Sequence, residues 1–381
     1  AEFLFKNLDT VILDEWHELM GSKRGSQTEL CLSWLRQQRP KLQTWAISAT
    51  IGNLNQAARH ALGTKCQPIM IGGAPARTTD IRSIFPETID GFPWAGHLGL
   101  RMYEELVAVL NPSVSTLLFT NTRNQSERWH QCLRFACPEM EGALALHHSA
   151  IDRGERESIE SAVKAGDIRW VVCTSSLDLG VDFQPVEQVV QIGSPKNLAR
   201  LLQRAGRSAH VPGGTSKVLF MPTNALELLE LSAVRRGLEE GLVEQRKPPN
   251  APLDVLLQHL TSLACGPGFN PEQTLSSVKT SASYEHLSQA DWDWSLMFLK
   301  DGGECLGAYP RYKKLEWSTE SDRFHIREKT IARLHRFNIG TITAAPSITV
   351  RFVRGAVLGH VEETFISQLK PKDVFFFSGR Q

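Results

Sequence analysis

The sequence predicts an α/β protein with two parallel-sheet domains, followed by a small helical unit and a β-rich region. Three observations lead to this fold class. Through the first 245 residues, short apolar runs alternate with helical patterns, which is typical of parallel sheets covered on both faces. A proline-rich segment, RKPPNAP at 246–252, then marks a boundary. From residue 305 onward the apolar segments become short, β-rich and bounded by turns.

These changes of pattern divide the 381 residues into segments, and a chain of this length is expected to hold two to four domains. Proline and glycine are frequent between Gly72 and Gly99, which predicts a linker there. We expect a first sheet domain at 1–75, the linker at 76–99, a second sheet domain at 100–245, a helical unit at 246–302 and a β-rich domain at 303–381.

The strands of both sheets are predicted from consecutive β-capable apolar residues, as in the buried run Val11, Ile12 and Leu13. A helix is expected from about Gln27 to Gln38, because Pro40 follows it directly. Further strands are expected at 44–50, 115–120, 169–174 and 186–193, and further helices at 225–245, 252–264 and 285–300.

Composition excludes several classes of protein. The formal net charge of +1 argues against a uniformly basic protein but leaves room for a local basic groove. Seven cysteines form no CxxC pair, so free thiols in a reducing cytoplasm fit better than disulfides or a zinc site. No apolar run approaches the roughly 18 residues of a membrane span, and the first residues lack the pattern of a signal peptide.

The clearest local motif is VILDEWHE, in which an apolar strand ends in Asp14 and Glu15, followed by His17. Ligands of parallel α/β sheets bind outside the carboxyl ends of the strands. Asp14 could therefore hold a Mg²⁺ that bridges two phosphates, while Glu15 orients or polarises an attacking water. The alternative is a strand-end aspartate that caps the next helix.

Two further motifs suit phosphate chemistry. The motif QRAGR contains Gln203 and two arginines, Arg204 and Arg207, with a glycine between them. An arginine in such a motif can stabilise charge on a γ-phosphate. The alternative is a solvated basic helix face. In TSSLDLGVDF, the hydroxyls of Thr174 and Ser175 suit phosphate oxygens, although such a run also starts helices. Asp182, after Gly180 in the same motif, suits a ribose hydroxyl.

The order of the motifs is more informative than any one of them. DEWH, SAT, FTNTR, HHSAIDRGER, TSSLDLGVDF and QRAGRSAH follow one another as the helicase motifs from II to VI do. With DEWHELMGSKRG, PLDVLLQHL, HRFNIGTI and LGHVEETFISQLKPKDVFFFSGR, the sequence resembles a superfamily-two DExH helicase of the Lhr (large helicase-related) family. The sequences of these motifs are most similar to those of the ligase-associated bacterial branch.

The resemblance implies the remainder of a first RecA-like domain, a complete second RecA-like domain, a winged-helix domain and an Lhr-type β-rich domain, the last expected to be incomplete. It implies ATP and Mg²⁺ as cofactors and ATP hydrolysis that depends on single-stranded DNA. This hydrolysis would drive 3′-to-5′ translocation and the unwinding of 3′-tailed duplexes, DNA:DNA or RNA:DNA. A functional link to a DNA ligase and a nuclease, and a role in DNA repair, are implied by the branch.

Roles for single residues follow from matching the motifs. Asp14 becomes the Mg²⁺ residue, through water, and Glu15 the water residue, with Arg207 as an arginine finger that Gln203 and Arg204 support. His17, Ser48 and Thr50 are assigned to the coupling of ATP to DNA. Gly180 and Asp182 are assigned to contact with the nucleotide. Contact with the DNA backbone is assigned to Thr120, Asn121, Arg123, His148, Thr174 and Ser175. His210 departs from the general superfamily pattern, because many relatives have a second arginine there.

The 381 residues contain no GxxxxGK[ST] loop, the motif whose backbone and lysine grip ATP. We therefore expect the chain alone to be inactive, although a protein that also carries the loop would be an ATP-driven helicase. Two alternatives remain open: an RNA helicase of the same superfamily, and a nucleic-acid-binding module without catalytic activity.

A basic region beyond the motifs surrounds Trp317 and includes Arg333. Basic side chains interleaved with an aromatic ring suit single-stranded nucleic acid, where phosphates meet the charges and a base stacks on the ring. The alternative is that Trp317 packs in a β-rich core and the charges are solvated. Trp292 and Trp294 are expected in the core of the winged-helix domain.

Overall fold

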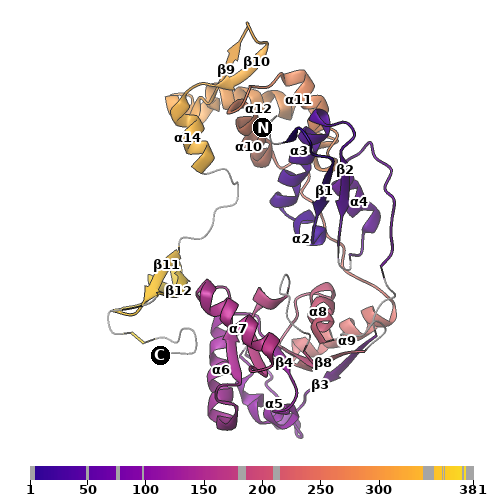
Figure 1. The fold of residues 1–381 in the computed structure, drawn as a ribbon, viewed down its shortest axis with the longest axis vertical. Coiled ribbons are helices and arrows are strands. Elements are labelled where there is room, and N and C mark those ends of the chain that lie inside the picture. The colour runs from indigo at the N-terminus through magenta and orange to yellow at the C-terminus, as the bar shows by residue number, and fades with distance from the viewer. Residues whose placement is uncertain are drawn as a thin grey trace. The chain divides into compact units, whose positions relative to one another are not determined.

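The computed structural model describes residues 5–48, 51–73, 78–96, 98–178, 186–208, 215–337, 347–353, 355, 357–370 and 373–374 (Figure 1). The chain forms two compact units. The first combines residues 1–71 with 245–344, and the second combines residues 72–244 with 345–381. Each unit is therefore built from segments that lie far apart in the sequence.

The second unit contains a six-stranded parallel sheet with the strand order β3-β8-β7-β4-β6-β5, which confirms the predicted α/β class. Its central strands β4 and β6 are buried at every residue because their sequences, TLLF and WVVC, are apolar on both faces. The strands are β3 (Thr79–Ser83), β4 (Thr116–Phe119), β5 (Leu144–His147), β6 (Trp170–Cys173), β7 (Gln188–Ile192) and β8 (Ser216–Met221).

Helices cover both faces of this sheet, because successive strand residues point to opposite sides. Leu118 packs in a cluster with Trp129 of α6, whereas its neighbours Leu117 and Phe119 pack in another cluster with Leu177. The helices are α5 (Tyr103–Val109), α6 (Arg123–Ala136), α7 (Arg153–Ala165), α8 (Leu198–Ala205) and α9 (Leu226–Glu239).

Two segments of this unit differ from the sequence prediction. The expected linker contains strand β3, which pairs with β8 at the sheet edge and packs Ile81 against the cluster of Leu198 and Val218. A short edge strand with mixed polarity gives too weak a pattern to be recognised. The helix expected to continue to residue 245 ends at Glu239, since Gly241 takes a left-handed backbone conformation with φ of 63°.

The first unit begins with a parallel strand pair, β1 (Thr10–Leu13) and β2 (Gln43–Ala46). Leu13 is buried against Trp16. Ile12, however, is 60% exposed, and its partner in register, Trp45, is 59% exposed. The prediction of a fully buried strand is therefore wrong, because the described helices α2 (Trp16–Met20), α3 (Lys23–Gln38) and α4 (Leu54–Leu62) share a core with Val11 and Leu13 on one face of the pair.

The rest of the described part of the first unit contains helices and a hairpin, several of which share one core. Trp292 is 2% exposed in this core, as predicted, but Trp294 is 41% exposed and stacks on Phe298, so its predicted core position is wrong. Leu315 and Phe324 of the hairpin lie in the same cluster, so the boundary expected after residue 302 does not separate two cores. The elements are α10 (Leu253–Ala264), α11 (Pro271–Val278), α12 (Gln289–Asp301), α13 (Gly303–Leu306), β9 (Leu315–Ser318), β10 (Arg323–Ile326) and α14 (Lys329–Phe337).

A second hairpin, β11 (Ser347–Arg351) and β12 (Val357–Glu362), belongs to the second unit together with α15 (Glu363–Ile366). Ile151 and Gly359 form an antiparallel bridge, and Val361 packs on Ala150. Of the predicted strand DVFFFSG, only residues 373–374 are described. Among the described residues of the whole chain, no helix has both the length and the apolar character needed to cross a membrane.

Candidate nucleotide and nucleic-acid residues

The two predicted catalytic carboxylates lie in the turn between β1 and α2. Asp14 is exposed, and its Oδ1 accepts a hydrogen bond of 3.0 Å from the backbone N–H of Glu15. Glu15 itself has φ of 49° and ψ of 43°, the left-handed conformation that side-chain-bearing residues seldom adopt. Non-glycine residues in this conformation persist where the surrounding structure imposes it, and they are frequent at functional sites.

His17 lies under this turn, with its side chain only 1% exposed. Its Nδ1 is 3.4 Å from Oε2 of Glu15, and its Nε2 is 3.5 Å from Oε1 of Glu18. Burial lowers the pKa of His17, while the carboxylates of Glu18 and Glu15 act to raise it. Arg246 then contacts Glu18 at 3.3 Å. The imidazole therefore links the predicted water-activating carboxylate to a residue more than 200 positions away in the sequence.

The SAT motif follows β2, the strand beside β1. The backbone N–H of Ile47 donates to the carbonyl of Leu13, and that of Trp16 donates to the carbonyl of Ile47, so the two strand ends are tied together. Ser48 is half-buried, and its Oγ has no hydrogen-bond partner among the described residues. Thr50 lies outside the described residues.

In the second unit, the predicted nucleic-acid residues follow the carboxyl ends of β4, β5 and β6, three strands that are neighbours in the sheet. Three of their side chains are buried: Thr120, His148 and Thr174. The hydroxyl of Thr120 donates to the carbonyl of Cys173. Burial therefore supports a role in holding the strand ends, rather than direct contact with a ligand, for these three residues.

His148 is held by both ring nitrogens. Nδ1 accepts a hydrogen bond of 3.3 Å from the backbone N–H of Ala150, so Nε2 carries the proton and donates to Oε1 of Glu127 at 2.9 Å. Both His148 and Glu127 are buried, on a loop and on α6 respectively. This pair fixes the loop after β5, and Glu127 is a contributor that the sequence motifs did not indicate.

Ser175 is exposed, and Arg123 and Asn121 are half-buried, so these three residues are more accessible. Arg123 begins α6, whose N-terminus is capped by the side chain of Thr122. A helix N-terminus favours anions, and an arginine there adds a charged donor. These three residues present polar groups at the carboxyl edge of the sheet, where ligands of such sheets bind.

Arg204 of the QRAGR motif is buried, with an exposure of 1%. Its Nε donates to Oδ1 of Asp178 at 2.8 Å, its Nη1 donates to Oε1 of Gln191 at 2.6 Å, and its guanidinium lies over the ring of Phe119. A buried arginine needs such a set of partners to offset its desolvation. The burial and the hydrogen bonds of Arg204 therefore favour a role in positioning its neighbours.

Arg207 lies in the turn after α8 and donates from Nη2 to the backbone carbonyl of Asp178 at 2.8 Å. Asp178 thus joins the two arginines, through its carboxylate to Arg204 and through its carbonyl to Arg207. Sequence reasoning missed this role, although Asp178 stands inside the TSSLDLG motif. Gln203 is half-buried on α8. Gly180, Asp182 and His210 lie outside the described residues.

Trp317 on β9 is 38% exposed and packs edge-on against Phe324, with ring centroids 5.0 Å apart. This position lies between the two alternatives predicted for Trp317, base stacking and packing in a core, because the ring packs in the hairpin and is still partly accessible. Arg333 is exposed on α14, with its guanidinium 5.8 Å from the ring of Phe337. Both residues belong to the first unit.

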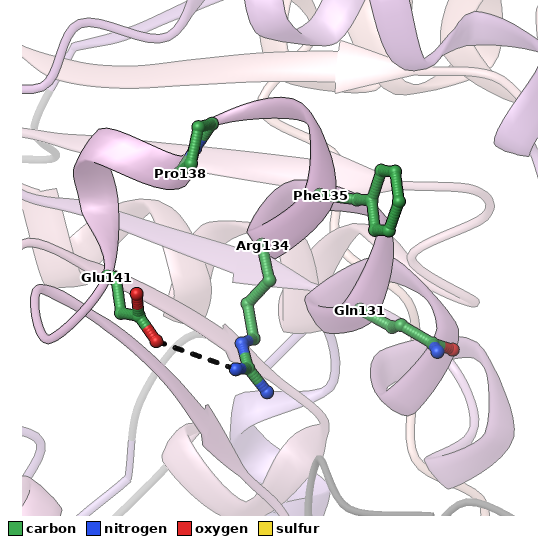
Figure 2. Close-up of a pocket in the computed structure, with 5 residues that line it drawn as sticks. All are labelled: Gln131, Arg134, Phe135, Pro138 and Glu141. Carbon is green, nitrogen blue, oxygen red and sulfur yellow. Dashed lines mark ion pairs between the residues drawn. The ribbon is translucent and has the colours of Figure 1, made fainter.

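A cavity of about 300 Å³ lies in the second unit, at the end of α6 (Figure 2). Figure 2 shows Arg134 and Glu141 turned toward each other across it, and they form an ion pair of 3.8 Å. Phe135 also lines this cavity and is 93% exposed. None of the predicted site residues lines it, so the cavity does not mark the candidate site.

Comparison with known proteins supports the motif assignments at the level of domains. Residues 236–381 match the winged helix domain of large helicase-related protein. Residues 101–211 match the helicase conserved C-terminal domain, and residues 1–57 match the DEAD/DEAH box helicases. The fold and the domain matches together define the chain as the core of a DEAD/DEAH-type helicase.

More narrowly, the chain belongs to the large helicase-related (Lhr) family. It is 30% identical to ATP-dependent helicase Lhr-Core protein 2 of Thermococcus barophilus, over 98% of this chain and 44% of that relative. It is 31% identical to ATP-dependent helicase Lhr-Core of Methanothermobacter thermautotrophicus, over 97% of this chain and 44% of that relative. The chain thus spans less than half the length of these relatives.

A solved structure agrees with this assignment. The helicase Lhr of Mycobacterium smegmatis, described as bound to ssDNA and AMP-PNP, superimposes with a TM-score of 0.75 and 26% identity. The match covers 89% of this chain and 44% of that chain. The more specific assignment to the ligase-associated branch stays a prediction.

Proposed function

We propose that a protein containing this chain is an ATP-dependent 3′-to-5′ DNA helicase with ATPase activity that depends on single-stranded DNA. The observation that carries the proposal is the position of the motif residues. Glu15 and Ser48 follow two paired parallel strands of one unit, and Asn121, Arg123 and Ser175 follow neighbouring parallel strands of the other. Family membership and the DNA-bound Lhr relative add support.

The nucleotide chemistry is assigned to residues of the DEWH and QRAGR motifs. Asp14 is exposed and keeps a carboxylate oxygen beyond the one that accepts from Glu15, so it fits a hydrated Mg²⁺, which prefers oxygen ligands. When bound, Mg²⁺ supplies positive charge to the phosphate oxygens. Glu15 orients and polarises the attacking water, and Arg207 stabilises negative charge that develops on the γ-phosphate. Arg204 positions Arg207 through Asp178.

The nucleic-acid chemistry is assigned to the accessible strand-end residues. Arg123, Asn121 and Ser175 contact the DNA backbone, while Thr120, His148 and Thr174 hold the loops that carry them. Trp317 stacks on a base and Arg333 contacts phosphate. A cytoplasmic setting, a role in DNA repair and a link to a ligase and a nuclease remain predictions from the sequence.

Glu15→Gln tests the proposal. In a chain extended upstream with a phosphate-binding loop, this change should leave ATP and DNA affinity nearly unaltered and abolish turnover, since it removes a group that acts mainly in the transition state. Steady-state ATPase assays with and without single-stranded DNA or RNA measure the effect, and Asp9→Asn serves as a charge-matched control on an exposed residue. Hydrolysis that survives within about tenfold, near 1.4 kcal/mol, would remove Glu15 from this role. Equal stimulation by RNA would favour the RNA helicase.

A further inference from the structure

The hairpin β11–β12 brings a carboxylate to one of the proposed DNA-contacting residues. Oε1 of Glu362, the last residue of β12, lies 3.8 Å from Nη1 of Arg123. Among the described residues, the guanidinium of Arg123 also donates a hydrogen bond of 3.3 Å from Nη2 to Oγ of Ser149. Arg123 and Glu362 are 239 residues apart in the sequence, so the contact exists only because the hairpin docks on this unit.

Backbone hydrogen bonds hold the hairpin in this place. Figure 1 shows its two strands, β11 and β12. The N–H of His360 donates to the carbonyl of Ala150 at 2.9 Å, and the N–H of Asp152 donates to the carbonyl of Leu358 at 3.2 Å. Val361 buries its side chain against Ala150 in the same contact. These bonds do not involve the Glu362 carboxylate, so its side chain can leave Arg123 while the hairpin stays docked.

The ion pair itself is open to solvent. The side chain of Arg123 is 42% exposed and that of Glu362 is 53% exposed, and such pairs are weak because water and salt screen them. Arg123 also lies at the N-terminus of the 14-residue helix α6, where negative charge is favoured. The Glu362 carboxylate thus presents negative charge to the same guanidinium that a phosphate oxygen would contact.

We propose that Glu362 competes with a nucleic-acid phosphate for Arg123 and thereby weakens binding of the strand and eases its release. The inference rests on the proposed function, because it assumes that Arg123 contacts the DNA backbone. A strand that binds must exchange the carboxylate for a phosphate at the same guanidinium. A motor that steps along DNA has to release each phosphate, and an internal competitor lowers the cost of that release.

Glu362→Gln in the 381-residue chain tests the competition. Affinity for a fluorescein-labelled single-stranded DNA oligonucleotide is measured by anisotropy without ATP. Removing the competitor should tighten binding roughly two- to fivefold, the range expected for an exposed ion pair. Glu363→Gln is the matched control, because it makes the same charge change one residue further on and contacts no described basic group in an ion pair. It should alter affinity by less than about half of that effect.

A double-mutant cycle with Arg123→Ala separates competition from a general charge effect. If Glu362 acts through Arg123, the gain from Glu362→Gln disappears in the Arg123→Ala background. The Glu362→Gln variant should also show a steeper salt dependence of binding, by up to about one unit, since no freed carboxylate then takes up a cation.

The outcomes are distinct. Equal effects of Glu362→Gln and Glu363→Gln, or a gain that persists without Arg123, would overturn the competition while leaving the proposed function intact. Failure of the unaltered chain and of all variants to bind single-stranded DNA would contradict the proposed function, and the competition with it. Circular dichroism spectra of the variants verify that the changes leave the fold unaltered.

Discussion

At the residue scale, Arg204 illustrates how a motif residue can act through its neighbours. Its guanidinium is buried and bonded to Asp178 and Gln191, so removing it leaves the Asp178 carboxylate buried without its main partner. Arg204→Ala should therefore lower the free energy of unfolding by about 3–5 kcal/mol. Urea denaturation measures this change.

Arg200→Ala is the control for that prediction. Arg200 contacts the same carboxylate at 3.4 Å but is 34% exposed, so its loss should cost less than about 1 kcal/mol. Similar losses for Arg200→Ala and Arg204→Ala would mean that burial of Arg204 does not set its contribution. The result bears on function as well, because Asp178 also binds Arg207 through its carbonyl.

His130 on α6 should make the free energy of unfolding depend on pH. Burial lowers its pKa from 6.5 to about 4, so the folded state holds the neutral imidazole and the unfolded chain binds the proton more readily. The stability it supports is present above pH 6.5 and is lost as the pH falls from 6.5 toward 4. Between pH 7 and pH 5 the loss should be about 2 kcal/mol. Urea denaturation of the wild type and of His130→Gln at both pH values should show a smaller pH dependence in the variant; equal slopes would contradict the assignment.

At the element scale, helix α3 joins two cores of the first unit. Leu30 is fully buried in the cluster of the winged-helix residues Val255 and Leu256, whereas Leu32 packs with Leu13 and Trp16. A buried network reinforces this junction, since Oε2 of Glu29 accepts from the backbone N–H of Ser283 at 2.8 Å, and Oε1 lies 2.7 Å from Nδ1 of His60. The helix therefore fixes the winged-helix residues to the strands that carry Asp14 and Glu15.

Leu30→Ala should destabilise both parts of the first unit. Deleting a fully buried leucine side chain costs about 2–5 kcal/mol, because a cavity remains. Amide hydrogen exchange should rise in α10 as well as in α3, since both lie against the lost side chain. Leu334→Ala, at a position 64% exposed, should change stability by less than about 0.5 kcal/mol. Faster exchange confined to α3 would show that α10 does not depend on this contact.

At the scale of the whole molecule, the 381 residues hold the hydrolysis motifs without a GxxxxGK[ST] loop. The purified chain should therefore show no DNA-stimulated ATP hydrolysis, because the backbone cradle and lysine that bind the phosphates are absent from it. A chain extended upstream with the loop should be active. Robust DNA-stimulated turnover by residues 1–381 alone, measured in a coupled ATPase assay, would refute this expectation.

The family, the α/β class and the order of the motifs follow from the amino-acid sequence, because these depend on residue types at fixed spacing along the chain. DEWH, TSSLDLGVDF and QRAGR are recognisable without knowing what surrounds them. Strands β4 and β6 were predicted for the same reason, since a run of apolar residues that is buried on both faces is visible in the sequence.

Tertiary structure alone decided which motif residues are accessible and what they contact. Arg204 and His148 are buried while Arg123 is accessible, and Trp294 is exposed while Trp292 is not. Asp178, Glu127 and Glu362 are the acidic partners of Arg204, His148 and Arg123. Burial and pairing depend on packing between residues far apart in the chain, as with β3 at the sheet edge and α3 between two cores. Local spacing carries no information about such partners, so their roles could be read only from the folded molecule.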